Sequence, residues 1–136
     1  MKNYPRFILL DDDLFALTIA TKIIRDHCRR VEITSFTACK EAIAYLEAGR
    51  FARKHPRAVL LTDLHMPEAD GFCLLDRMEK VPREMKDRLH IFVLSSEACP
   101  EEINRVLSYS CVTGFYNKPL SIDKIRHIMA CVEYPI

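Results

Sequence analysis

The sequence has little glycine, no long apolar run and almost no net charge. Only three of its 136 residues are glycine, and no Gly-rich phosphate loop occurs, which argues against a flavin or nucleotide binder. Lysines and arginines number 20 against 19 acidic residues, so the net charge of +1 gives no electrostatic basis for binding nucleic acid. No apolar stretch approaches the roughly 20 residues that span a bilayer. We therefore expect neither nucleic acid nor a membrane as a partner.

Cysteine pairs at redox or zinc-finger spacing are also absent. The six cysteines are residues 28, 39, 73, 99, 111 and 131, and none of them forms a C-x-x-C pair. Most lie in segments with apolar periodicity, and the histidines do not stand at zinc-ligand spacing from them. The apolar run near the N-terminus is too short for the core of a signal peptide. We expect reduced core cysteines in a cytoplasmic protein.

The length predicts a single domain, because 136 residues and 15.8 kDa suffice for one core but not for two. Val132 is the last apolar position of the final predicted helix, and four residues follow it in the sequence. We expect residues 1–136 to form one domain without a DNA-binding or enzymatic output domain.

Short apolar runs alternate with segments of helical periodicity along the whole chain, which predicts βα units and a parallel sheet. The expected strands are residues 7–10, 31–36, 58–62, 90–94 and 112–116. Helices are expected over about 14–28 and 101–109, and around the apolar residues of segments 42–46, 72–78 and 122–132.

Five strands and five helices are most economically arranged as an α/β, flavodoxin-like, doubly wound parallel sheet of order 2-1-3-4-5. Imperfect alternation makes residues 31–36 an edge strand. The basic segment 50–57 and the charged segment 80–88 are interpreted as solvated connections.

Acidic residues stand where two of the predicted strands end. Asp11, Asp12 and Asp13 follow the first strand, and Asp63 follows the third. The carboxyl ends of neighbouring parallel strands meet at one edge of the sheet, so we expect Asp11, Asp12 and Asp63 to converge. Each aspartate alone is also a common helix cap or turn residue, and Asp13 is the natural cap of the first helix. Adjacent carboxylates repel one another, however, and their grouping favours a bound cation such as Mg²⁺.

A hydroxyl and an ammonium group end the next two strands, at Ser95 and Lys118. Asp63 is either a further metal ligand or a nucleophile that becomes an aspartyl phosphate. A nucleophilic carboxylate requires donors for the oxygens of the transferred phosphoryl group, and Ser95 and Lys118 are such donors.

Together these motifs resemble the receiver domain of two-component response regulators, in the single-domain form of the chemotaxis regulators. The resemblance covers residue 7 to about 132. It rests on the segments Leu-Asp-Asp-Asp at 10–13, Asp-Leu-His-Met-Pro-Glu-Ala-Asp-Gly at 63–71, Leu-Ser-Ser-Glu-Ala at 94–98 and Gly-Phe-Tyr-Asn-Lys-Pro-Leu at 114–120.

The resemblance implies a role for each site residue. Asp63 would be the phosphoacceptor, with Ser95 and Lys118 binding phosphoryl oxygens. Asp11, Asp12, Asp63 and the backbone carbonyl of His65 would bind Mg²⁺, with Asp11 acting largely through water. Ser95 and Phe115 would form the switch, although Phe115 lacks the hydroxyl of the tyrosine that is frequent there. His65 and Glu97 would tune the lifetime of the aspartyl phosphate.

The resemblance also implies partners and an output. A histidine kinase or a histidine phosphotransfer protein would supply the phosphoryl group, and the chain would act as a signalling module that catalyses only its own phosphorylation and dephosphorylation. An unknown downstream protein would bind the face formed by the fourth predicted helix, the fifth strand and the fifth helix.

Two other functions remain open at this point. A small Mg²⁺-dependent phosphohydrolase of the haloacid-dehalogenase kind also uses an aspartyl phosphate, but its Asp-x-Asp-x-Thr or Val motif would require another residue at Phe15. The other is a receiver-like docking module that works without phosphorylation, which the complete set of acids, hydroxyl and lysine argues against.

Overall fold

Five parallel strands form one sheet in the order β2-β1-β3-β4-β5, which confirms the predicted topology. The computed structural model describes residues 4–52, 57–66 and 71–132. The strands are β1 (Arg6–Leu10), β2 (Glu32–Phe36), β3 (Ala58–Asp63), β4 (Leu89–Ser95) and β5 (Val112–Asn117). Residues 1–3, residues 53–56 of the basic segment, residues 67–70 of the motif at 63–71, and the C-terminal residues 133–136 lie outside the described residues.

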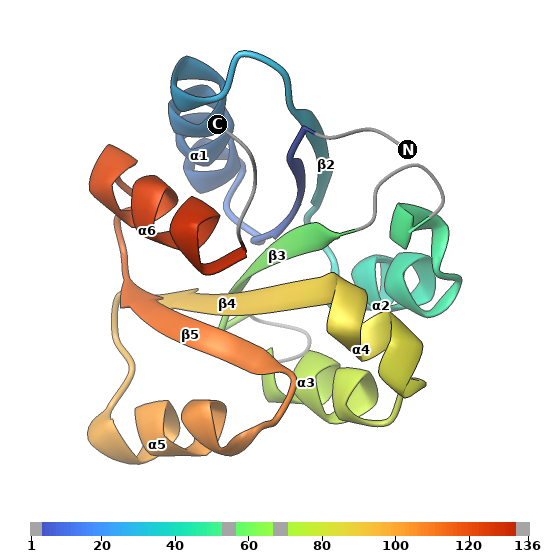
Figure 1. Cartoon of the computed structure of the whole chain (residues 1–136). Coiled ribbons are helices and arrows are strands. Elements are labelled where there is room, and N and C mark those ends of the chain that lie inside the picture. The colour runs from blue at the N-terminus through green and yellow to red at the C-terminus, as the bar shows by residue number, and fades with distance from the viewer. Residues whose placement is uncertain (1–3, 53–56, 67–70, 133–136) are drawn as a thin grey trace.

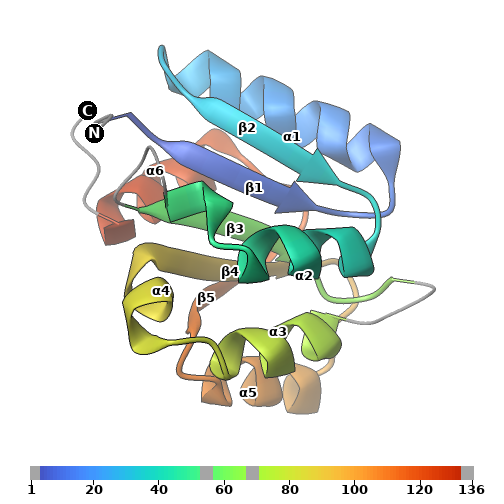
Figure 2. The same cartoon turned by 90° about the vertical axis from the view of Figure 1, so that its right-hand side faces the viewer.

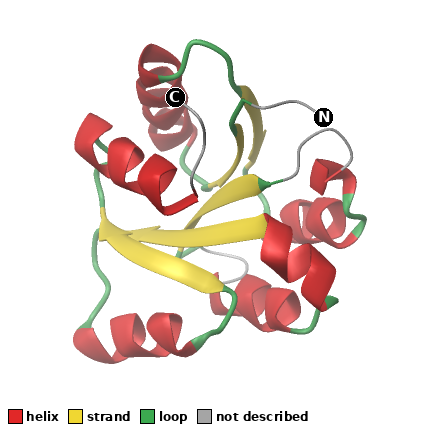
Figure 3. Ribbon diagram, viewed as in Figure 1, coloured by secondary structure: helices red, strands yellow, loops and turns green. Residues whose placement is uncertain are grey.

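Helices cover both faces of this sheet (Figures 1 and 3). They are α1 (Leu14–His27), α2 (Cys39–Glu47), α3 (Gly71–Glu79), α4 (Arg83–Arg88), α5 (Pro100–Ser108) and α6 (Ile122–Val132), with a short 3₁₀ helix, η1 (Arg50–Ala52). The longest, α1, has 14 residues. No helix within the described ranges is both long enough and apolar enough to cross a membrane.

The alternation of side chains along the strands divides the core into two layers. On one side, Phe7, Val59 and Phe92 pack with apolar residues of α1 and α6. On the other, Ile8 and Leu60 pack with apolar residues of α2, α3 and α5. Figure 2 shows the same division of helices between the two faces. Both layers exclude water from the sheet, so polar chemistry is left to the strand ends.

Strand positions in the sheet explain their sequence patterns. All six residues of β3 are buried because helices cover both of its faces, and it therefore reads as a continuous apolar run. β2 lies at the edge of the sheet, as predicted, and none of its residues is fully buried.

The structure adds a helix that the sequence prediction lacked. Residues 80–88 were interpreted as a charged connection, but Arg83–Arg88 form α4, so the described part contains six α-helices rather than five. Pro82 precedes its first turn, Glu84 lies in that turn, and Lys86 and Arg88 lie in its last turn, all of which suit the helix dipole. No residue of α4 is buried, so it has no apolar stripe by which periodicity would reveal it.

The prediction that the cysteines are core residues is wrong for half of them. Cys28, Cys39 and Cys111 are buried, whereas Cys73, Cys99 and Cys131 are exposed. Burial raises the pKa of Cys111 to about 12, so this thiol stays protonated and packs as a small apolar group.

Polar and aromatic contacts join helix α5 and the residue that follows it to α3. Val106 is the one buried residue of α5. The guanidinium of Arg105 lies 3.8 Å from the ring centre of Phe72 in α3, and the Tyr109 hydroxyl donates to Asp76 of α3 at 2.5 Å. α5 is therefore joined to α3 along one side by groups that also contact solvent.

A carboxylate at the end of α3 closes the turn between α5 and β5. Glu79 accepts hydrogen bonds from the backbone N–H of Ser110 at 3.1 Å, from the Ser110 hydroxyl at 2.9 Å and from the backbone N–H of Cys111 at 2.9 Å. Desolvation alone would raise the pKa of Glu79, but these bonds lower it to about 2.

We expect Glu79→Gln to lower the free energy of unfolding at neutral pH by about 1 kcal/mol, a value discounted because a third of the carboxylate is exposed. The pKa is lowered on folding from 4.5 to about 2. The carboxylate therefore stabilises the protein above pH 4.5, and this contribution is lost as the pH falls toward 2. Denaturant titrations at several pH values measure both effects. Glu84→Gln on the exposed side of α4 is the matched control, and equal losses in the two variants would contradict this assignment.

Candidate functional site

The register of the sheet brings the predicted site residues to one edge. Leu10, which precedes the aspartates, pairs with Thr62 beside Asp63. Asp63 pairs with Leu94, next to Ser95, and Ser95 pairs with Asn117, which precedes Lys118. The backbone N–H of Lys118 also donates to the Ser95 carbonyl at 3.0 Å, close to the cis peptide bond between Lys118 and Pro119. Four strand ends therefore deliver their polar residues to one place.

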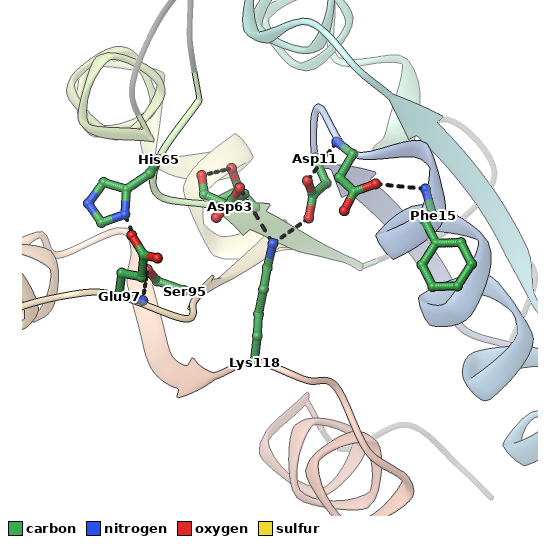
Figure 4. A network of polar contacts seen from close by, with 9 residues as sticks. Asp11, Phe15, Asp63, His65, Ser95, Glu97 and Lys118 are labelled. Atoms are coloured by element: carbon green, nitrogen blue, oxygen red, sulfur yellow. Dashed lines mark hydrogen bonds and ion pairs between the residues drawn. The ribbon is translucent and has the colours of Figure 1, made fainter.

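Three carboxylates converge there, as the sequence predicts. Ligand oxygens of Asp11, Asp12 and Asp63 lie within 4.8 Å of one another. Asp11 and Asp63 are buried, whereas Asp12 is exposed. The Lys118 ammonium group lies between the two buried carboxylates, 2.6 Å from Oδ2 of Asp11 and 3.5 Å from Oδ2 of Asp63 (Figure 4). One cation thus balances part of the charge of the three carboxylates.

The charges at the site shift each other's pKa values. Burial raises the pKa of Asp63, and the charge of Asp11 adds to this, whereas Lys118 and a backbone hydrogen bond from His65 oppose it. Burial would lower the pKa of Lys118, but its hydrogen bond to Asp11 and the charge of Asp63 raise it overall. Lys118 is therefore firmly cationic, and Asp63 is a more basic carboxylate than an exposed aspartate.

The donor set fits a magnesium ion. Three carboxylates supply the hard oxygen ligands that Mg²⁺ prefers, and the exposure of Asp12 leaves room for the water molecules that this ion retains. Lys118 compensates only one of the three negative charges, so a divalent cation would lower the remaining repulsion. The metal-binding role predicted for the His65 carbonyl stays a prediction.

Asp13, the third aspartate of the run, serves α1 instead. Its carboxylate accepts a hydrogen bond from the backbone N–H of Phe15 at 2.9 Å, which makes it the N-cap of α1, as predicted. Its own backbone N–H donates to Asp11 at 2.9 Å and fixes the orientation of that carboxylate. The Asp13 carboxylate therefore caps α1 and is not among the three carboxylates that converge.

The Ser95 side chain lies at the other flank of the site. It is 1% exposed, and its Oγ accepts a hydrogen bond from the backbone N–H of Glu97 at 3.3 Å. Its Oγ is also 3.4 Å from Nδ1 of His65. The predicted lifetime-tuning residues, His65 and Glu97, thus both contact Ser95, the former through its ring and the latter through its backbone.

Phe115, the aromatic residue of the predicted switch, is half-buried. It packs against the core layer beneath α2, α3 and α5, together with the partly buried Ala98 and Met66. Its neighbour Tyr116 points to the opposite layer and stacks on Phe92 with a centroid distance of 5.8 Å. Whether Phe115 changes its rotamer stays a prediction.

Two residues near the site were not singled out from the sequence. Glu102, in the first turn of α5, lies 2.7 Å from Nε2 of His65. Gly71 begins α3 so close to the end of β3 that a Cβ there would lie 2.9 Å from the carbonyl oxygen of Asp63. A sequence signal existed for Glu102, since glutamate at the third helical position favours a capping box.

Comparison with known proteins identifies related sequences. A family model described as the response regulator receiver domain matches residues 7–130. The two-component response regulator ORR3 of rice (Oryza sativa subsp. indica) is 31% identical over 124 residues, which cover 91% of this chain and 87% of that protein.

Solved structures share the fold. A two-component response regulator from Cytophaga hutchinsonii superposes with a TM-score of 0.85 at 26% identity, over 98% of this chain and all of that one. A response regulator receiver protein from Dyadobacter fermentans gives a TM-score of 0.80 at 24% identity, over 91% of this chain and 94% of that one. The fold of this chain is therefore that of solved response regulators.

We expect Asp12→Asn to weaken Mg²⁺ binding by about tenfold or more, because it removes one of three converging charges. Asp13→Asn is the matched control: it changes the adjacent aspartate, and asparagine still caps a helix. Isothermal titration calorimetry with MgCl₂ measures both affinities. Equal Mg²⁺ affinity in the Asp12 variant and the wild type would reject the cluster as the metal site.

Proposed function

This chain belongs to the response regulator receiver domain family, and we propose that it is a phosphorylation-controlled signalling module that accepts a phosphoryl group on Asp63. Receiver domains are signalling modules rather than conventional enzymes. The observation that carries the proposal is the buried Asp63 carboxylate, 3.5 Å from the Lys118 ammonium group and grouped with Asp11 and Asp12.

Phosphoryl transfer would proceed by attack of an Asp63 oxygen on phosphorus. As the new O–P bond forms, the N–P bond of a phosphohistidine breaks, and the leaving imidazole takes up a proton. The raised pKa of Asp63 makes its carboxylate a better nucleophile than that of an ordinary aspartate. Bound Mg²⁺, held by Asp11, Asp12, Asp63 and the His65 carbonyl, would neutralise charge on the transferred oxygens. Lys118 and Ser95 would bind phosphoryl oxygens.

The phosphodonor in this proposal is a histidine kinase or a histidine phosphotransfer protein. Such a protein must bring its phosphohistidine to Asp63, so the surface beside the site must accept a protein. Leu14, Phe15 and Ile19 of α1 are 68%, 73% and 41% exposed. Phe15 and Ile19 line a cavity of about 180 Å³ together with Asp11 and Lys118. Exposed apolar side chains at the rim of a charged site support docking of a partner there.

The output would be a binding surface for a downstream protein. We assign it to α5, β5 and α6, which correspond to the fourth helix, fifth strand and fifth helix of the sequence prediction. Ser95 and Phe115 would connect the phosphoryl group to this face, because Ser95 ends β4 and Phe115 lies in the neighbouring β5. His65 and Glu97 would set the lifetime of the aspartyl phosphate through access of water to Asp63.

The single-domain organisation of residues 1–136 and the cytoplasmic location stay predictions. The phosphohydrolase alternative loses support, because Asp13 caps α1, whereas that motif needs it in the site.

We expect Asp63→Asn to abolish phosphoryl uptake while the fold is retained, because the amide is a poor nucleophile. The measurement is intact-protein mass after incubation with acetyl phosphate and Mg²⁺. Asp26→Asn on the exposed side of α1 is the control and should gain one phosphoryl group, as the wild type does. Uptake by the Asp63 variant would mean that another residue is the acceptor.

We expect Lys118→Ala to fold and bind Mg²⁺ but to lose the conformational response to phosphorylation, because the ammonium group would connect β5 to the phosphoryl oxygens. Chemical shifts of α5, β5 and α6 with and without beryllium fluoride, a phosphoryl mimic, measure this response. Lys22→Ala, an exposed lysine of α1, should respond like the wild type. A full response in the Lys118 variant would exclude this role.

A further inference from the structure

Three polar side chains form a chain of contacts from α5 to the hydroxyl of Ser95. Glu102 Oε2 lies 2.7 Å from Nε2 of His65, and the other ring nitrogen, Nδ1, lies 3.4 Å from Oγ of Ser95. The imidazole is 43% exposed and the Glu102 side chain 30%, whereas Ser95 is 1% exposed. The chain thus leads from the surface to a buried hydroxyl beside Asp63.

The chemistry of these groups fixes the direction of the hydrogen bonds. A carboxylate can only accept, so Nε2 of His65 donates its hydrogen to Glu102. In the neutral imidazole Nδ1 is then a bare acceptor, and the Ser95 hydroxyl donates to it. The Ser95 oxygen itself accepts from the backbone N–H of Glu97 at 3.3 Å. Every donor and acceptor in the chain is therefore matched.

A hydroxyl has one hydrogen and cannot donate it to two acceptors. In the proposed function, on which this inference rests, Ser95 donates to a phosphoryl oxygen on Asp63. With Nε2 of a neutral His65 protonated, the same hydrogen is directed to Nδ1, which lies 3.4 Å from the Ser95 oxygen. His65 and the phosphoryl group thus compete for the Ser95 hydroxyl.

We propose that Glu102 is a positioning residue of the phosphorylation switch: it fixes the tautomer and orientation of His65, which holds the Ser95 hydroxyl in the unphosphorylated arrangement. Phosphorylation must break the bond between Ser95 and His65 before Ser95 reaches the phosphoryl group. Because Glu102 belongs to α5, its contact with His65 also connects the proposed output face to Ser95, beside Asp63.

Glu102 is itself held in place by the start of α5. Its second oxygen, Oε1, accepts from the backbone N–H of Cys99 at 3.1 Å, so that each carboxylate oxygen has one donor. The two bonds lower the pKa of Glu102 to about 2, with the larger effect from His65. The carboxylate therefore stays ionised across the physiological range and keeps the role of acceptor.

Glu102→Gln tests the proposal with almost no change in shape. Glutamine has one oxygen and one NH₂ group, and it also forms capping boxes. If its oxygen accepts from Cys99, its NH₂ group faces Nε2 of His65, and the imidazole must carry its hydrogen on Nδ1. The imidazole then donates to Ser95 rather than accepting from it, which frees the Ser95 hydroxyl.

The first measurement needs neither metal nor phosphate. Side-chain ¹⁵N shifts of His65, recorded at alkaline pH, report which nitrogen carries the hydrogen. We expect the Nε2–H tautomer in the wild type and the Nδ1–H tautomer in Glu102→Gln. An unchanged tautomer in the variant, or an imidazole of mixed tautomers in the wild type, would overturn the proposal.

The second measurement is the affinity for beryllium fluoride in saturating Mg²⁺. Release of one net hydrogen bond should tighten binding about threefold to tenfold in Glu102→Gln. The same substitution in a His65→Ala background should have no effect, since the imidazole through which Glu102 acts is then absent. The Mg²⁺ affinity of His65→Ala is measured as well, so that both backgrounds are compared at saturating Mg²⁺.

Two controls separate positioning from charge. Glu101→Gln removes the neighbouring exposed carboxylate of α5 and should bind beryllium fluoride like the wild type. Mg²⁺ affinity alone should be the same in the Glu102 variant and the wild type. The proposal fails if Glu101→Gln has the same effect, if Mg²⁺ affinity shifts by the same factor, or if the effect persists without His65.

A wild type that binds no beryllium fluoride would instead reject the proposed function, and the ¹⁵N shifts would still decide whether Glu102 positions His65.

Discussion

The functional site depends on the repulsion among three carboxylates that the fold brings to one edge of an otherwise apolar sheet. Asp11, Asp12 and Asp63 lie within 4.8 Å of one another, and Lys118 is the cation that contacts the two buried ones. Such a group is tolerated because the strands end there: Asp12 is exposed to solvent, and Lys118 contacts the two buried carboxylates. The parallel order of the strands is what makes the convergence possible, since it aligns all carboxyl ends on one side.

The strands and the main site were predictable because their signals are strong and local. Each buried strand is an apolar run, and each of β1, β3 and β4 is followed or ended by a polar residue with recognisable chemistry. Convergence of Asp11 and Asp63 followed from topology alone, because the first and third strands are neighbours in the predicted order. The cap of α1 by Asp13 followed from the preference of helices for an acidic N-cap.

The remaining features depend on contacts that leave no periodic signal. Helix α4 buries no residue, so its sequence is indistinguishable from a charged loop. The exposed Cys73 and Cys131 lie on helices α3 and α6, next to the apolar positions that face the core. Sequence periodicity alone does not distinguish their exposed positions from the buried ones. Glu102 meets His65 across 37 positions of sequence, which no local pattern encodes. The sequence therefore predicts which polar residues stand at the strand ends, but not which helix residues contact them.

The way α5 is attached has a consequence for local unfolding. A helix with one buried side chain, Val106, has little apolar surface to lose on opening, and its contacts with α3 can be exchanged for contacts with water. The free energy of opening this segment is therefore lower than that of the sheet, whose central strand is buried throughout. Amide hydrogens of α5 should exchange with solvent through partial opening, whereas those of β3 should exchange only through global unfolding. A protein that binds α5 can thus reshape it at small energetic cost while the buried strand β3 keeps its structure.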